Sequence, residues 1–171
     1  MMNERYPIGE FDCAEHISTE EIKAWINEIR TLPRRLIVIV KHLSDEDLES
    51  TYREGSWTIR QIVHHIADSH MNAYIRFKLA LTEENPTIKP YAEDKWAKLP
   101  DSKLPIATSL KIIESLHERW VYLIENLTNE QLKKTFIHPD SGIVSVEKNI
   151  GIYAWHGNHH IAHIKNALKQ F

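Results

Sequence analysis

The chain has 171 residues, of which 42% are hydrophobic and 26% are charged, as expected for one globular domain that buries its own core. The formal net charge of -3 provides no basic field for phosphate groups and argues against a nucleic-acid partner. The single cysteine, Cys13, excludes an intramolecular disulfide and favours a reducing compartment. We therefore expect one domain over residues 1–171.

No stretch of the sequence resembles an export signal or a membrane span. Residues 1–7 are not followed by the apolar segment of a signal peptide. The longest aliphatic run, residues 36–40, is far shorter than the roughly 20 residues of a transmembrane helix. We predict a cytoplasmic protein without membrane partners.

The first half of the chain predicts two long helices. Apolar residues spaced by three and four positions indicate a helix from about residue 19 to 43, which begins at the Ser18–Glu21 capping box and is kinked at Pro33. A second capping box, Thr58–Gln61, begins a helix that reaches about residue 82.

The second half begins with a long irregular stretch. Four prolines between residues 83 and 105 exclude a long helix there, although residues 93–98 fit one or two turns. This stretch is either a cover over a functional site or a packed crossover. Helical spacing then predicts a third helix from about 107 to 127 and a fourth from about 145 to the end.

A weak internal repeat relates the two halves. Residues 43–48 (LSDEDL) resemble residues 127–132 (LTNEQL). In both copies an aromatic residue, Tyr52 or Phe136, follows four positions after the last leucine. Each copy follows a long helix and precedes a histidine-bearing one, so two pseudo-repeated helix pairs predict a four-helix bundle. Strand patterns are scarce, with residues 142–145 as the main example, and the predicted fold class is all-α.

Histidine is concentrated in two windows. The chain has eleven histidines, and seven of them lie in residues 64–70 and 156–163. The last helix holds two pairs one turn apart, His156 with His160 and His159 with His163. On a helical wheel the first pair faces the flank or interior of the bundle, and the second pair faces water.

A pair of imidazoles on one helix is an incomplete metal site, because transition metals take three or four ligands. The first window offers His64, His65 and His70 as a third ligand. His65 shares a polar stripe of its helix with Ser69, whereas His70 lies on the apolar face. Bundle sites are built from facing helices, which favours a functional metal site over adventitious binding by surface histidines.

Three segments carry a resemblance to a known family: Tyr6-Pro7-Ile8-Gly9-Glu10, the Trp57–His70 stretch and the Trp155–His163 stretch. Together they resemble the YfiT branch of the DinB-like superfamily over essentially the whole chain. The resemblance implies a four-helix bundle with a three-histidine metal site. Members are named as metal-dependent hydrolases, and near relatives in Bacillus-type bacteria are bacillithiol S-transferases.

The resemblance also implies which histidines bind the metal. One ligand of the family lies eight residues after the tryptophan that opens the second helix, and the other two form an H-x-x-x-H pair on the last helix. These positions are His65, His156 and His160 here, with His64 as the alternative to His65. The remaining histidines, His70, His159 and His163, are then either supports of the ligands or solvent-facing residues.

Three neutral imidazoles leave a divalent metal, Zn²⁺ first and Ni²⁺ as an alternative, with open positions that can activate water or a thiol. Cys13 has no cationic neighbour to activate it, so a thiol would be a cosubstrate such as bacillithiol. The nearest carboxylates, Asp68 and Glu147, have no spacing that marks a general base, and no catalytic acid or base is assigned.

The function predicted from the sequence is therefore a metal-dependent hydrolase of the YfiT type, or a thiol S-transferase, that acts on a small electrophile. The alternative is a non-catalytic, metal-binding stress-response bundle. A homodimer is the assembly that the resemblance implies.

Overall fold

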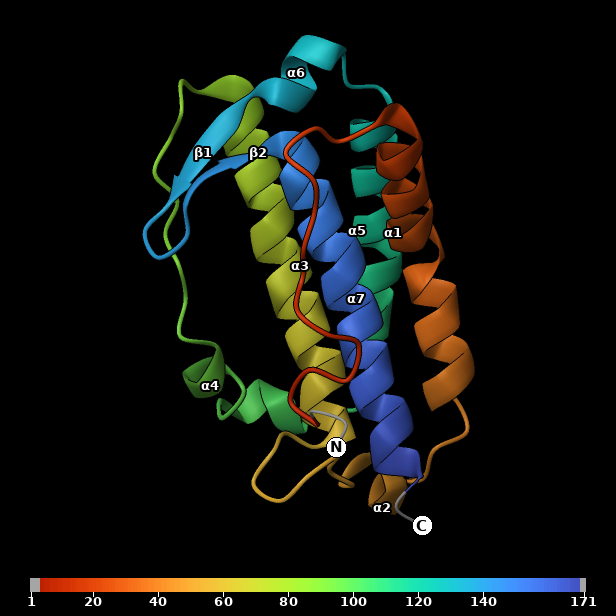
Figure 1. The fold of residues 1–171 in the computed structure, drawn as a ribbon. Helices are drawn as coiled ribbons and strands as arrows, with labels where there is room; N and C mark the ends of the chain where they lie inside the picture. Colours follow the sequence, from red (N-terminus) through yellow and green to blue (C-terminus); the bar gives the residue numbers. More distant parts are fainter. Residues whose placement is uncertain (1–3, 170–171) are drawn as a thin grey trace.

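The computed structural model describes residues 4–169 as a bundle of four long helices (Figure 1). These helices are α1 (Thr19–Val40), α3 (Ile59–Thr82), α5 (Ala107–Glu125) and α7 (Val146–Leu168). The predicted all-α four-helix bundle is confirmed. Residues 1–3, part of the N-terminal stretch used to predict the location, and residues 170–171, where the fourth helix was expected to end, lie outside the described residues.

Short elements connect the long helices. They are α2 (Asp45–Leu48), α4 (Glu93–Trp96), the 3-10 helix η1 (Pro100–Lys103), α6 (Asn129–Lys133), and the strands β1 (Thr135–His138) and β2 (Gly142–Ser145). Within the described residues, none of the helices is long and apolar enough to cross a membrane.

Local sequence signals set the helix starts. The side chains of Ser18 and Thr58 accept hydrogen bonds from the third helical N–H of α1 and α3, which completes both expected capping boxes. Helix α1 continues through Pro33 and bends about midway along its length (Figure 1). It ends at Val40, three residues before the predicted end.

The internal repeat corresponds to two similar turns. Ser44 and Thr128 each form a capping box at the start of a short helix, α2 and α6 respectively. In both copies the short helix follows a long one and leads toward a histidine-bearing one, α3 or α7.

A small hairpin adds to the predicted all-α fold. Strands β1 and β2 pair antiparallel, with Phe136 opposite Val144, and both of these side chains join the core. Residues 142–145 were noted as a possible strand but their partner, residues 135–138, was not, because a four-residue strand with one buried face gives too short a pattern to distinguish from a loop.

The order of the helices explains the long crossover. Helices α3 and α5 run in the same direction, opposite to α1 and α7, so residues 83–106 must return along the whole bundle (Figure 1). Helix α3 packs against α5 and α7, and α1 packs against the same two helices. As a result, α3 and α7 are antiparallel neighbours, and their two histidine windows meet.

The core consists of two apolar clusters along the bundle. One contains residues 22–29 of α1, with Phe77, Trp120 and Ile150, and the other contains residues 32–40 of α1, with Ile66. On every long helix a few positions separate the two clusters. On α3, α5 and α7 these positions hold histidines, so a polar layer crosses the middle of the bundle. Together with His65, which lies within the α3 part of the second cluster, they form what we call the histidine layer: His65, His70, His117, His156 and His160.

Candidate metal centre

Three histidines of two antiparallel helices converge in the histidine layer. His65 extends from α3, while His156 and His160, one turn apart, extend from α7. The Nε2 atoms of His65 and His156 are 3.2 Å apart. One ring nitrogen from each of the three lies within 4.8 Å of the others. The structure thus brings together the three residues that the sequence analysis proposed as metal ligands.

The three rings form part of the wall of an open cavity of about 440 Å³. Trp57 packs against the His65 ring with 4.5 Å between centroids. The other side chains around the cavity come from the N-terminal segment, the α2–α3 loop, α4 and α7: Arg5, Tyr6, Tyr52, Arg53, Ser56, Glu93, Asp94, Trp155, His159 and His163. The cavity gives a small molecule access to the histidine nitrogens.

Burial keeps the three imidazoles neutral. It lowers the pKa of His65 to about 4 and lowers the pKa values of His156 and His160 well below the usual range of histidine. A neutral ring offers a lone pair on one nitrogen. Two nitrogens on one tetrahedral zinc ion, with bonds of roughly 2.0–2.1 Å, lie about as far apart as His65 and His156 do here. The donor set therefore fits a divalent transition metal.

Further histidines support two of these rings from behind. Nδ1 of His156 lies 3.0 Å from Nε2 of His70, and Nδ1 of His70 lies 2.8 Å from Nε2 of His117. Nδ1 of His160 lies 3.4 Å from Nδ1 of His163. The outward nitrogens of His156 and His160 thus have partners, as is usual for metal-binding histidines.

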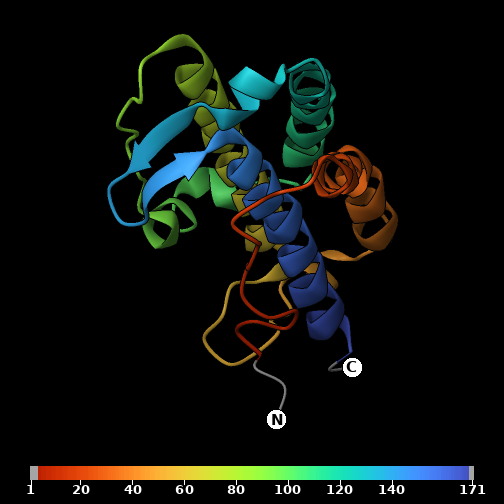
Figure 2. The ribbon, with the colours of Figure 1, turned by 45° about the horizontal axis from the view of Figure 1, so that its top comes forward.

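The prediction that His159 and His163 face water is wrong. Both are buried, with 7% and 3% of their surface exposed. Tyr52 stacks on the His163 ring at 3.9 Å, and Nε2 of His163 lies 3.2 Å from the carbonyl of Arg5. The N-terminal segment crosses this face of α7 (Figures 1 and 2). The helical wheel considered the bundle helices alone and could not include this segment.

His64, the alternative to His65, points elsewhere. Its Nδ1 lies 2.7 Å from Oγ of Ser109, and its Nε2 lies 2.9 Å from the carbonyl oxygen of Leu104. His64 therefore ties α3 to the start of α5 and is not brought to the cluster.

A second group of histidines, His159, His160 and His163, also has ring nitrogens within 4.8 Å of one another. Because a carbonyl can only accept, Nε2–H of His163 donates to Arg5. Nδ1 of a neutral His163 then accepts the proton of His160 Nδ1. This arrangement leaves Nε2 of His160 for the cluster with His65, so we interpret His163 as a support of that ligand.

Two residues near the cluster, His117 and Glu93, were not predicted from the sequence. His117 follows Ile113 by four positions and precedes Trp120 by three, so its place on the apolar face of its helix was a usable signal. Glu93 lines the cavity from α4 and is exposed to it, and partial desolvation, with Asp94 contributing, raises the pKa of its carboxyl. The stretch at residues 83–105 thus contributes Glu93 and Asp94 to the wall of the cavity, and its role as a cover over the site stays a prediction.

The two carboxylates noted in the sequence have other surroundings. Glu147 forms an ion pair with Lys133 at 2.7 Å, which joins α6 to the start of α7. Burial raises the pKa of Asp68 to about 6, with Asp101 contributing. Neither residue acquires a role in the cluster from these contacts.

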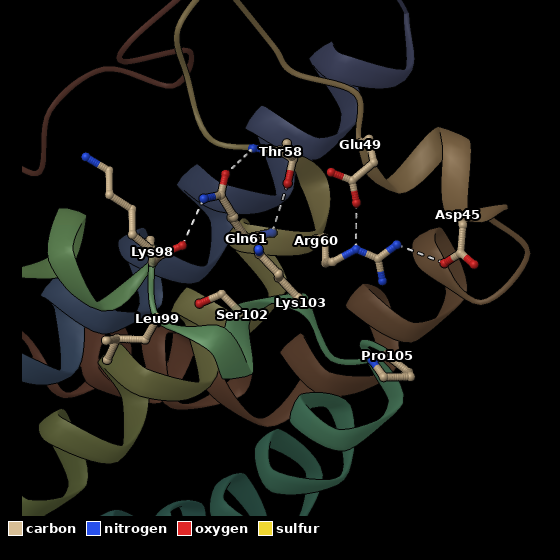
Figure 3. A pocket seen from close by; sticks show the side chains of 11 residues that line it. Asp45, Glu49, Thr58, Arg60, Gln61, Lys98, Leu99, Ser102, Lys103 and Pro105 are labelled. Atoms are coloured by element: carbon tan, nitrogen blue, oxygen red, sulfur yellow. Dashed lines mark hydrogen bonds and ion pairs between the residues drawn. The ribbon is translucent and has the colours of Figure 1, made fainter.

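Another cavity, of about 690 Å³, lies beside the start of α3 (Figure 3). Arg60 forms ion pairs with Asp45 and Glu49 in its wall. Gln61 bonds to Thr58 and to the carbonyl of Ala97. Because these groups are engaged with one another, this cavity is a weaker candidate for catalysis than the histidine-lined one.

A family model described as the DinB superfamily matches residues 28–164. The chain belongs to the DinB superfamily. The matched range includes every histidine of the cluster and all four long helices except the start of α1 and the end of α7. This DinB protein therefore belongs to the family that the Trp57–His70 and Trp155–His163 segments indicated.

Curated relatives of this DinB protein cover nearly its full length. A protein of Halalkalibacterium halodurans is 54% identical over 98% of both chains, and one of Oceanobacillus iheyensis is 57% identical over 99% of this chain and 98% of the relative. Both carry the name "Putative metal-dependent hydrolase".

Solved structures share the fold. YfiT from Bacillus subtilis, described as a probable metal-dependent hydrolase with an unusual four-helix bundle topology, superposes with a TM-score of 0.95 at 47% identity, covering 98% of this chain and 97% of YfiT. A mycothiol-dependent maleylpyruvate isomerase gives a TM-score of 0.66 at 14% identity, covering 83% of this chain and 60% of that one, a likeness of fold alone.

Proposed function

We propose that this chain is a metal-dependent hydrolase in which His65, His156 and His160 hold one divalent cation, Zn²⁺ first and Ni²⁺ as the alternative. The observation that carries the proposal is the convergence of three imidazole nitrogens from α3 and α7 within 4.8 Å at the wall of an open cavity. The names of relatives at 54% and 57% identity support the same activity.

When bound, a divalent cation with three neutral imidazole ligands supplies a Lewis acid with open positions, which makes water or a thiol nucleophilic near neutral pH. The chain itself contributes a carboxylate that can accept a proton and an aromatic side chain that excludes water. Glu93 lines the cavity, and its raised pKa makes it a better acceptor for a proton released there than a glutamate of ordinary pKa would be. Trp57 covers one side of His65 and keeps water from that side of the ring.

The proposed substrate is a small electrophile, and two cationic side chains of the cavity favour an anionic second substrate. Arg5 and Arg53 line the cavity together with the histidines. Nε of Arg53 is buried and has no hydrogen-bond partner among the described residues. An anionic cosubstrate would meet positive charge there, so thiol S-transfer, with a low-molecular-weight thiol such as bacillithiol, is the second candidate function.

One set of assays tests both candidates. Protein purified without a histidine tag or nickel resin is loaded with Zn²⁺ or Ni²⁺ and incubated with a haloalkane or chlorobimane, with and without a low-molecular-weight thiol. Turnover without thiol supports hydrolysis, and turnover that requires thiol supports transfer. Stoichiometric metal without turnover on any electrophile would contradict both and favour the non-catalytic metal-binding bundle.

The assembly and location are part of the proposal. We propose a cytoplasmic homodimer whose partners are small molecules rather than nucleic acid or membranes. Light scattering on the purified protein tests the assembly, since a mass near 20.0 kDa would identify a monomer.

A further inference from the structure

Two buried histidines, His70 and His117, lie behind the proposed ligand His156 and take no part in the chemistry above. They are 0% and 2% exposed, respectively. From His156 on α7, a chain of hydrogen bonds passes to His70 on α3 at 3.0 Å and to His117 on α5 at 2.8 Å. It ends at the carbonyl of Ile29 on α1, which is 2.7 Å from Nδ1 of His117. One chain of contacts therefore joins all four long helices.

The last acceptor sets the direction of every bond in this chain. A backbone carbonyl has no proton to donate, so Nδ1 of His117 must carry the hydrogen. Nε2 of a neutral His117 is then a lone pair, which accepts from Nδ1–H of His70. Nε2 of a neutral His70 in turn accepts from Nδ1–H of His156.

Each ring in the chain holds a single proton because the surroundings are dry. Among the described residues, the ring nitrogens of His70 and His117 contact other imidazoles and the carbonyl of Ile29 and no carboxylate, so nothing in this enclosed place stabilises a second proton on either ring. A ring with one proton has one donor nitrogen and one acceptor nitrogen. The direction of the hydrogen bond to Ile29 therefore fixes the direction of each following bond as far as His156.

We propose that His70 and His117 are positioning residues that fix His156 as the Nδ1–H tautomer, so that its Nε2 lone pair faces the metal. The inference rests on the proposed metal centre. The opposite tautomer would direct an N–H into the cluster. It would also place two lone pairs against each other at the contact between His70 and His117, because Ile29 holds the proton of His117 on Nδ1.

The first test uses the metal-free wild-type protein. Long-range ¹⁵N–¹H correlation spectra assign the tautomer of each histidine ring. The expected result is a proton on Nδ1 of His117, His70 and His156. A proton on Nε2 of His70 or His156 overturns the inference. Because this measurement needs no metal, a wild-type protein that binds no metal would contradict the proposed function and leave the tautomer result to decide the inference separately.

The second test separates positioning from packing with a matched pair of variants. His117→Phe keeps a ring of similar volume but removes the acceptor for His70, whereas His117→Gln keeps an oxygen near the position of Nε2. We expect His117→Phe to lower Zn²⁺ affinity roughly 10-fold to 100-fold, as loss of an outer-shell partner does, and His117→Gln to restore most of it. Affinity is measured by competition with a chelator.

Equal Zn²⁺ affinity of His117→Phe and wild type overturns the inference. Equal losses in His117→Phe and His117→Gln overturn it as well, because packing alone would account for them. If His117→Phe does not fold, the tautomers of the wild-type protein decide the matter.

Discussion

His64 and His65 are neighbours in the sequence with different surroundings in the bundle. The His65 ring lies beside His156 in the wall of the cavity, whereas the His64 ring contacts Ser109 and Leu104 on the side of α5. A helical turn of about 100° between consecutive residues is enough to separate a proposed ligand from a structural residue.

This difference predicts opposite outcomes for two alanine variants. His64→Ala should retain the metal but lose about 1–3 kcal/mol of stability, because it leaves Ser109 and Leu104 without a buried partner. His65→Ala should lose stoichiometric metal. Metal analysis and urea denaturation of both variants check this, and metal retained in His65→Ala but lost in His64→Ala would reverse the assignment.

Glu93 is the carboxylate whose role follows from its place in the cavity. Because it is proposed to accept a proton rather than to hold the metal, Glu93→Gln should lower kcat by about 10²-fold or more while metal content stays unchanged. Asp94→Asn, the neighbouring carboxylate of the same cavity, is the matched control. An equal loss of kcat in both variants would point to the charge of the cavity instead.

At the scale of elements, the long helices could be predicted from the sequence because their signals are local. Capping boxes such as Ser18–Glu21 and apolar spacing along 59–82 depend on residues within a few turns. The ligands His156 and His160 followed from the same helical spacing, whereas His65 required the resemblance to a family.

The remainder depends on contacts between distant parts of the chain. The N–H of Trp155 donates to the carbonyl of Gly9, and this contact helps to hold the N-terminal segment over His159 and His163. No periodicity in α7 contains that information. The chain of hydrogen bonds from His156 to His117 likewise involves three helices, so its partners can be identified only once the packing of the helices is known.

The cap of α3 offers a test of how strongly one element supports the bundle. Thr58 accepts a hydrogen bond from the N–H of Gln61 at the start of this 24-residue helix. Thr58→Ala should therefore lower the free energy of unfolding by about 1 kcal/mol. The same change at Thr128, the cap of the five-residue helix α6, should cost less. Denaturation curves in which Thr128→Ala costs more would contradict this view.

For the whole molecule, the histidine layer is a polar section between two apolar clusters, and it makes stability depend on pH. Burial lowers the pKa of His117 to about 4 in the folded state, against roughly 6.5 for an unfolded histidine. Between these values the unfolded chain binds more protons than the folded one. The free energy of unfolding therefore falls as the pH is lowered.

We expect His117 to contribute at most about 1.4 kcal/mol of destabilisation per pH unit in this range, measured by denaturation of the metal-free protein. His117→Gln removes the titrating group, and its curve should be flatter than that of the wild type between pH 6.5 and about 4. Parallel curves for the two proteins would show that His117 is not held neutral by burial.

His65, His156 and His160 are proposed to form one metal site. Its most direct test is the metal content of wild type, His65→Ala, His156→Ala and His160→Ala, each purified without a histidine tag or nickel resin and analysed by elemental mass spectrometry. We predict one divalent metal ion per wild-type chain and loss of stoichiometric metal in all three variants. Stoichiometric metal retained in the three variants would contradict the account.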